Sequence, residues 1–401
     1  MSFVHMPSSD LCAPLAQSSA NDPCQVFLFL GPQVGRYGGM ENHGHALLRW
    51  LRHAKAEYTL GACFVKDELG RTVQLNEHGS AIDCCDSAKK LACLVNLLAR
   101  GRRVVMFFNT GHWIEELAEL RKSVLGALFV ARTGGNEILQ ASLTDMSIKH
   151  HDRQTIWVNT INRCIDVFIT NSAFTERRLS GLGIDAKLCA RVRGGVDTQA
   201  AAHHLGARRS RTAPAIRRVV WAGRFVAFKG LHVLLDAMHM LTRDDVELVL
   251  IGDGPLLPDV QDHAVRLGMA SRVRFTGALA PHECLQALAT CDLYVALSLA
   301  QERMVSGGRY VHTETMGRSV MEALCCGLRV VASDVGGLAE LVGPGVGELV
   351  PAGDAEAAAG AIARQLALPP MTQTQRLALA ADFDWTTVFG RYAALWSSGH
   401  A

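Results

Sequence analysis

The chain alternates short apolar runs with longer stretches in which the apolar residues have helical spacing. Such short runs are typical of strands buried on both faces of a sheet. Helical spacing is clear at Ala46, Leu47, Trp50 and Leu51. Strands alternating with helices predict parallel, doubly wound α/β sheets that bind ligands beyond the carboxyl ends of their strands. The predicted strands cover residues 25–30, 58–64, 104–108, 127–131, 167–170, 187–192, 219–221, 247–251, 272–275, 292–297 and 347–350.

The length of 401 residues exceeds what one hydrophobic core usually holds and suits two domains. Residues 198–216 have almost no large apolar side chain, carry several arginines before a proline, and predict a linker. We expect a first α/β domain at residues 25–197 and a second at residues 217–382. Residues 1–24 are small and polar, do not resemble a signal peptide, and predict a disordered lead-in.

Composition removes several classes of function. A formal net charge of +2 is too small to indicate a nucleic-acid partner. The 12 cysteines show no C-x-x-C spacing, so we expect reduced thiols, a cytoplasmic location and no metal site. No window approaches the ~20 apolar residues of a spanning helix, which leaves membrane contact at most peripheral. These features leave open whether the chain is a monomer or a homodimer.

The stretch 310–340 contains the most informative candidate site residues. Glu314 and Glu322 lie on either side of Gly317, where apolar helical spacing begins, so Glu322 is expected on a helix and Glu314 in the loop before it. The free N–H groups and positive dipole of a helix start attract phosphate, whereas a neighbouring carboxylate suits sugar hydroxyls. The stretch therefore predicts a nucleotide-sugar pocket. The N–H groups expected to face phosphate are those of Thr315, Met316, Gly317 and Arg318.

A second group of residues follows the strand at 219–221. Its loop, AGRFVAFKG, places Arg224 and Lys229 just before a new apolar helix. Two cations at a strand end can neutralise a diphosphate. Gly223 and Gly230 allow the backbone to pass close to that ligand. We therefore expect this loop to bind the same nucleotide sugar.

The spacing Glu, seven residues, Glu, followed by an apolar strand and a Gly-Gly-x-x-Glu turn, resembles the retaining group 1 glycosyltransferases (family 4) of the GT-B fold. The resemblance implies that Glu314 holds the donor hexose, Glu322 holds the ribose, and the backbone at Leu279 contacts the base. It implies that Gly223, Arg224 and Lys229 grip the diphosphate. It further implies that a final helix, residues 383–399, returns to the first domain.

The same resemblance gives the reaction. It implies transfer of a hexosyl group from a nucleoside diphosphate sugar with retained anomeric configuration, with a phosphate oxygen taking the proton of the acceptor hydroxyl. No metal or other cofactor is required for such a step. We expect a UDP-linked donor, with N-acetylglucosamine or glucose as the sugar, and a small molecule or a glycan as the acceptor.

In the first domain the resemblance places Gly38, Gly39 and Glu41 on the floor of the interdomain cleft. His112, in the loop after strand 104–108, could hydrogen-bond the donor sugar or the reacting phosphate. This chain departs from the family at Thr133, where a histidine is common. The polar residues offered there for acceptor contact are Arg132, Asn136 and Glu137.

A polar insert, AQERMVSGGRYVHT, lies between Ser298 and Glu314, beside the expected sugar site. Most members of the resembled family are shorter there. The sequence YVHTETMGRS is similar to the glycosyltransferases that act on 2-deoxystreptamine-type aminocyclitols. The alternatives are a glycosyltransferase of polysaccharide or lipopolysaccharide assembly, a nucleotide-sugar epimerase of the same fold, and a non-catalytic sugar-nucleotide-binding protein. The insert residues expected to select substrate are Arg303, Arg309, Tyr310 and His312.

Overall fold

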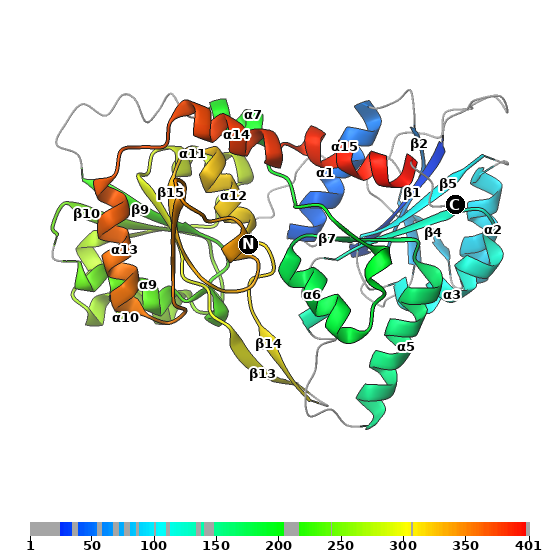
Figure 1. Cartoon of the computed structure of the whole chain (residues 1–401), viewed down its shortest axis with the longest axis horizontal. Coiled ribbons are helices and arrows are strands. Elements are labelled where there is room, and N and C mark those ends of the chain that lie inside the picture. Colours follow the sequence, from blue (N-terminus) through cyan, green and yellow to red (C-terminus); the bar gives the residue numbers. More distant parts are fainter. Residues whose placement is uncertain are drawn as a thin grey trace.

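The computed structural model describes residues 25–33, 39–53, 58–66, 72–75, 81–85, 88–99, 102–109, 113–133, 138–139, 148–203, 216–241, 243–305 and 308–397. The predicted lead-in at residues 1–24 lies outside these ranges. Within them the strands form two large α/β sheets, one from each half of the chain, and a separate two-stranded hairpin. Figure 1 shows the two halves side by side.

The first sheet has the strand order β4-β3-β2-β1-β5-β6-β7-β8. Its strands are parallel except β3 and β4, which add an antiparallel edge. Successive residues of β5 point to opposite faces: Met106 and Phe108 join one core, Val105 and Phe107 the other. The strands are β1 Gln25–Gln33, β2 Tyr58–Lys66, β3 Thr72–Leu75, β4 Ala81–Cys85, β5 Val104–Phe108, β6 Leu128–Arg132, β7 Val167–Thr170 and β8 Cys189–Arg191.

Helices cover both faces of this sheet. Helices α2, α3 and α5 contribute to the core that contains Phe108, and α1 contributes to the core that contains Phe107. Burial on both faces explains why the strands appear in the sequence as continuous apolar runs. The helices are α1 Gly39–His53, α2 Ala88–Ala99, α3 Ile114–Ser123, α5 Ile148–Cys164 and α6 Ala173–Leu182.

The second sheet is parallel throughout, in the order β11-β10-β9-β12-β15-β16. Helices α9, α10 and α13 pack on one face, and α7, α11, α12 and α14 pack on the other. The strands are β9 Arg217–Ala222, β10 Val246–Ile251, β11 Val273–Gly277, β12 Leu293–Ala296, β15 Arg329–Ser333 and β16 Gly347–Val350. The helices are α7 Thr198–His203, α9 Leu231–Met240, α10 Leu257–Arg266, α11 Pro281–Ala289, α12 Arg318–Cys325, α13 Ala355–Ala367 and α14 Gln373–Phe383.

The last helix returns to the first half of the chain. Helix α15, Trp385–Ser397, buries Phe389, Tyr392 and Trp396 in the same core as α1 (Figure 1). Two segments run between the halves at adjacent points, because the Val196 N–H donates to the Phe383 carbonyl at 2.9 Å. The paired parallel sheets and the returning helix confirm the predicted fold class. The helix begins at Trp385 rather than at residue 383.

Three local features differ from the predicted elements. Residues 186–188 form a 3-10 turn before β8, because the Asp185 carboxylate accepts from the Lys187 N–H at 3.1 Å. The predicted linker begins with α7, whose Ala201 is buried against the second sheet, and residues 204–215 lie outside the described ranges. The insert forms an antiparallel hairpin, β13 Gln301–Val305 and β14 Gly308–His312, that projects from the second half (Figure 1).

In the part of the chain that the structure describes, none of the helices combines the length and the apolar character needed to cross a bilayer. The cysteines from Cys164 onward are free thiols, as is Cys93, and Cys325 and Cys326 are both buried in the second half. Burial raises the pKa of the Cys291 thiol to about 11 and that of Cys325 to about 12. These thiols are therefore packing groups rather than nucleophiles.

Candidate functional site

The loop before α12 is held by a pair of glycines from another loop. The Gly337 N–H donates to the Glu314 carbonyl at 3.0 Å. Gly336 has a φ of 56°, and a Cβ there would lie 1.8 Å from the same carbonyl oxygen. Gly317, with a φ of 88°, then starts the helix. The Gly-Gly turn of the sequence motif therefore fixes the backbone that carries Glu314.

The cationic loop after β9 reaches Glu314 directly. Lys229 ends a 3-10 turn, Ala227–Lys229, and its Nζ forms an ion pair with the Glu314 carboxylate. Gly230, with a φ of 66°, lets this turn pass the Leu297 carbonyl, which a Cβ would meet at 1.8 Å. The Lys229 and Glu314 side chains are 18% and 17% exposed. Two predicted site residues from separate loops are thus in contact, in a partly dehydrated setting.

The hairpin adds an aromatic stack to this ion pair. The His312 ring stacks on Phe228 with centroids 4.2 Å apart, and Lys229 Nζ lies 5.1 Å from the Phe228 centroid. Burial is the main cause that lowers the pKa of His312, followed by the charge of Arg303. Arg224 and Lys229 lower that pKa further, whereas Glu314 opposes them. Arg303 of the hairpin and the two predicted phosphate-binding cations therefore all lower the pKa of the His312 imidazole.

Helix α12 carries the second predicted carboxylate. Glu322 Oε1 accepts from Arg318 Nε at 3.1 Å, one turn away on the same helix. Beneath them the buried Tyr294 hydroxyl lies 2.7 Å from Ser319 Oγ, and burial raises the pKa of this phenol. Tyr294 was not predicted as a site residue, although a tyrosine inside the apolar run 292–297 is the signal that could have identified it. The predicted base contact Leu279 is partly buried in the adjoining core.

The remaining residues predicted to bind the donor lie in loops of the second half and at the start of α12. Gly223 faces Gly252. A Cβ added at Gly252 would lie 1.9 Å from the Gly223 carbonyl oxygen, so two loops of the second sheet meet there. Thr315 is buried, and Met316 packs partly buried against the core beneath α12. Arg224 is exposed at the end of β9. The structure therefore brings the loop after β9 and the loop before α12 together through the contact between Lys229 and Glu314.

The predicted acceptor residues of the first half are described only in part. Arg132 ends β6, is buried, and donates from Nε to the Tyr392 hydroxyl of α15 at 3.1 Å. Gly39 begins α1, and Glu41 belongs to it, although the Glu41 side chain is outside the described set. The other predicted residues lie outside the described ranges: Gly38, His112, Asn136 and Glu137.

A buried histidine that the sequence prediction missed lies on α1. His43 is 1% exposed, and its ring contacts the rings of Trp385, Phe389 and Tyr392 at centroid distances of 5.3–5.5 Å. Burial is the first cause that holds its pKa well below 6.5, and the charges of two nearby arginines, Arg132 and Arg318, add to it. The spacing of His43 from Ala46, Leu47 and Trp50 would have placed it on the apolar face of the helix.

Among the residues that the structure describes, no group of three or more His, Cys, Asp or Glu side chains is placed to hold a metal ion. Lys229 pairs with Glu314, and Arg224 lies near enough to lower the pKa of His312.

The second half of the chain matches the model of a known family. Residues 216–367 match the family model described as Glycosyl transferases group 1. They span the second sheet from β9 to β16 and include both predicted carboxylates and both predicted cations. The chain therefore carries a group 1 glycosyltransferase domain, as the sequence motifs indicated.

Solved structures extend the likeness to the whole fold. Anabaena HepE in complex with UDP has a TM-score of 0.65 at 23% identity, over 93% of this chain and 100% of that chain. Sucrose-phosphate synthase from Thermosynechococcus elongatus has a TM-score of 0.68 at 19% identity, over 94% of this chain and 100% of that chain. The two halves thus have the GT-B arrangement.

Curated relatives include enzymes of several pathways. Glycogen synthase of Mycobacterium tuberculosis is 31% identical over 204 residues, 49% of this chain and 45% of the relative. The 2-deoxystreptamine N-acetyl-D-glucosaminyltransferase of Streptomyces fradiae is 33% identical over 159 residues, 37% and 34% of the two chains. The alpha-D-kanosaminyltransferase of Streptomyces kanamyceticus is 31% identical over 158 residues, 39% and 38% of the two chains. Each match spans less than half of the relative's length. The predicted resemblance to the glycosyltransferases that act on 2-deoxystreptamine-type aminocyclitols is confirmed.

Proposed function

We propose that this protein is a retaining glycosyltransferase that moves a hexosyl group from a UDP-linked sugar to a hydroxyl acceptor. The observation that carries the proposal is the ion pair between Lys229 and Glu314 at the start of α12. A cation suited to phosphate and a carboxylate suited to sugar hydroxyls meet there from two separate loops. They do so within a group 1 glycosyltransferase domain.

The ion pair also suggests how the donor is accepted. Without donor, Lys229 neutralises Glu314. When the diphosphate enters, its oxygens take the place of the carboxylate at Lys229 Nζ, and Glu314 becomes available to the hexose hydroxyls. Lys229, Arg224 and the N–H groups of residues 315–318 then stabilise the charge that develops on the leaving diphosphate. Glu322 holds the ribose and Leu279 lies at the base.

The chemical step needs no metal in this proposal. A phosphate oxygen of the donor takes the proton of the acceptor hydroxyl on the same face of the sugar, and the anomeric configuration is retained. The first half supplies the acceptor side through Gly38, Gly39, Glu41, His112, Asn136 and Glu137. Arg132 also belongs to the acceptor side, and its hydrogen bond to the Tyr392 hydroxyl fixes the position of its guanidinium.

For the substrates, we propose N-acetylglucosamine or glucose on the donor and an aminocyclitol as acceptor. Support comes from the segment YVHTETMGRS and from two relatives named for aminoglycoside sugars or acceptors. UDP as the nucleotide is supported by the GT-B structures solved with it. The buried reduced thiols fit a cytoplasmic reaction.

The test is a transfer assay with UDP-glucose and UDP-N-acetylglucosamine as donors and 2-deoxystreptamine as acceptor. Mass spectrometry identifies the product. The coupling constant of the anomeric proton, measured by NMR, identifies the anomeric configuration of the product. Lys229→Ala and Glu314→Ala should each nearly abolish transfer while the thermal unfolding midpoint stays close to that of the wild type. Full activity of either variant, an inverted product, or release of an epimerised nucleotide sugar without acceptor would each overturn the proposal.

A further inference from the structure

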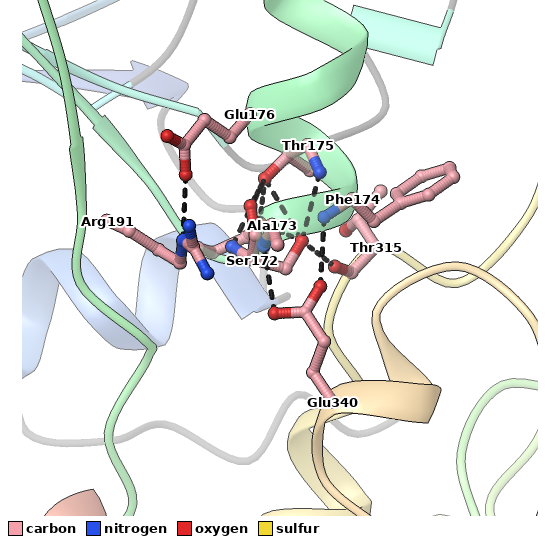
Figure 2. A network of polar contacts seen from close by, with 9 residues as sticks. Ser172, Ala173, Phe174, Thr175, Glu176, Arg191, Thr315 and Glu340 are labelled. Carbon is pink, nitrogen blue, oxygen red and sulfur yellow. Dashed lines mark hydrogen bonds and ion pairs between the residues drawn. The ribbon is translucent and has the colours of Figure 1, made fainter.

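Helix α6 in the first half has its start completed by a residue from the second half (Figure 2). The first N–H groups of a helix have no acceptor within the helix. Ser172 Oγ accepts from the Thr175 N–H at 3.1 Å, which satisfies one of them. The Ala173 and Phe174 N–H groups donate to the two carboxylate oxygens of Glu340 at 2.8 and 2.9 Å. Glu340 is the last residue of the 3-10 turn Leu338–Glu340, which follows the Gly-Gly turn.

Two more contacts join the first half to the loop before α12. The Ser172 hydroxyl, which caps α6, also donates to the Thr315 carbonyl at 2.7 Å, and both residues are buried (Figure 2). The Gly194 N–H lies 3.1 Å from the Met316 sulfur. Contacts from α6 and from residue 194 therefore converge on the segment that follows Glu314.

Glu340 belongs to the same structural unit as that loop. The Gly337 N–H, three residues before Glu340, donates to the Glu314 carbonyl at 3.0 Å. A force applied to the Glu340 carboxylate by α6 is therefore transmitted through one short turn to the backbone of Glu314. The helix dipole of α6 favours the carboxylate at this place, so the contact is attractive as well as geometrically fixed.

We propose that Glu340 is a positioning residue that holds the first half of the protein against the loop bearing Glu314. When the Glu340–α6 contact is made, that loop and the start of α12 have the geometry needed to bind the nucleotide. When the halves separate, Glu340 and the first N–H groups of α6 are both hydrated. The assignment of the loop to nucleotide binding rests on the proposed function, whereas the coupling of the two halves does not.

A purely local role predicts a different outcome. If Glu340 only caps α6, its loss affects the amides of Ala173 and Phe174 and the stability of that helix. If Glu340 positions the loop, its loss also affects Thr315, Met316 and Gly194, which lie beyond the two amides that donate to its carboxylate. Amide hydrogen exchange separates the two roles without reference to catalysis.

The experiment compares Glu340→Ala and Glu340→Gln with Glu176→Gln. The control residue lies in the same helix but pairs with Arg191 inside the first half, at 2.7 Å. Residue-resolved exchange is measured for each, and UDP is titrated by calorimetry. For Glu340→Ala we expect about tenfold faster exchange at Ala173 and Phe174, faster exchange at residues 314–317, and about threefold or greater weakening of UDP binding. Glu340→Gln should lie between, and Glu176→Gln should match the wild type at these positions.

Faster exchange confined to Ala173 and Phe174 in both Glu340 variants, with unchanged UDP affinity, would reduce Glu340 to a helix cap and overturn the inference. Unchanged exchange at these two amides would also overturn it. If Glu340→Ala does not fold, Glu340→Gln, which keeps the size of the side chain, decides the question. If the wild type binds no UDP, the proposed function fails, and exchange at residues 314–317 alone then decides whether Glu340 couples the two halves.

Discussion

Replacing Glu314 by glutamine should tighten the binding of UDP while it slows transfer. The change keeps the shape of the side chain but removes the negative charge that Lys229 pairs with. UDP has to displace this carboxylate before its phosphate reaches Lys229 Nζ. In the variant no carboxylate at position 314 competes with the phosphate of UDP for Lys229, so UDP binds more tightly. The sugar, in contrast, loses a charged acceptor for its hydroxyls.

The expected size follows from the burial of the pair. Two unit charges about 4 Å apart attract by about 4 kcal/mol at an effective dielectric constant of ~20. Both side chains retain some solvent contact, at 18% and 17% exposure, which reduces the measurable coupling to about 1–2 kcal/mol. The expected gain in UDP affinity is therefore about five- to thirtyfold. Loss of a charge-assisted hydrogen bond to the sugar should lower the transfer rate by about ten- to 150-fold.

A double-mutant cycle by calorimetry tests this account. UDP is titrated into the wild type, Glu314→Gln, Lys229→Met and the double variant. Glu314→Gln should tighten UDP in the presence of Lys229 and have little effect in its absence. Unchanged or weaker UDP binding by Glu314→Gln would refute the exchange of partners at Lys229. Equal tightening in both backgrounds would show that Glu314 only repels the diphosphate.

Two further predictions concern His43 and Gly336. The unfolded chain binds a proton at His43 near pH 6.5 while the folded ring stays neutral, so this group should cost about 1 kcal/mol of unfolding free energy between pH 6.5 and 5.5. The free energy of unfolding of His43→Phe, measured by urea denaturation, should fall by about 1 kcal/mol less than that of the wild type over this pH range. An equal fall in both proteins would contradict the burial of a neutral ring. Gly336→Ala should destabilise the fold by about 1–3 kcal/mol and weaken UDP binding, because the new Cβ meets the Glu314 carbonyl. Gly268→Ala, with a φ of 69° and no neighbour within 4 Å, controls for backbone strain, so equal effects of the two variants would count against the contact.

Much of the fold was accessible from sequence because buried parallel strands leave continuous apolar runs. The runs at residues 104–108 and 167–170 coincide with β5 and β7. The hairpin β13–β14 was missed because charged residues interrupt its apolar ones and its pairing depends on a partner strand rather than on burial. Helix α7 was missed because alanine and histidine provide little apolar periodicity.

The places of the predicted site residues in the fold were predictable where one loop follows one strand. Arg224 and Lys229 after β9, and Glu314 before α12, needed only the order of elements and the family motif. Contacts that depend on how the two halves dock could not be predicted, since Glu340 and Ala173 are 167 positions apart. The setting of His43 likewise depends on α15, which comes from the far end of the chain.

The return of α15 has a consequence for the order in which the protein folds during synthesis. The core around Phe107 and α1 is completed by Phe389, Tyr392 and Trp396, which are translated long after the strands that they cover. N-terminal domains commonly fold first during translation. Here one face of the N-terminal sheet keeps its apolar surface uncovered until α15 has been translated.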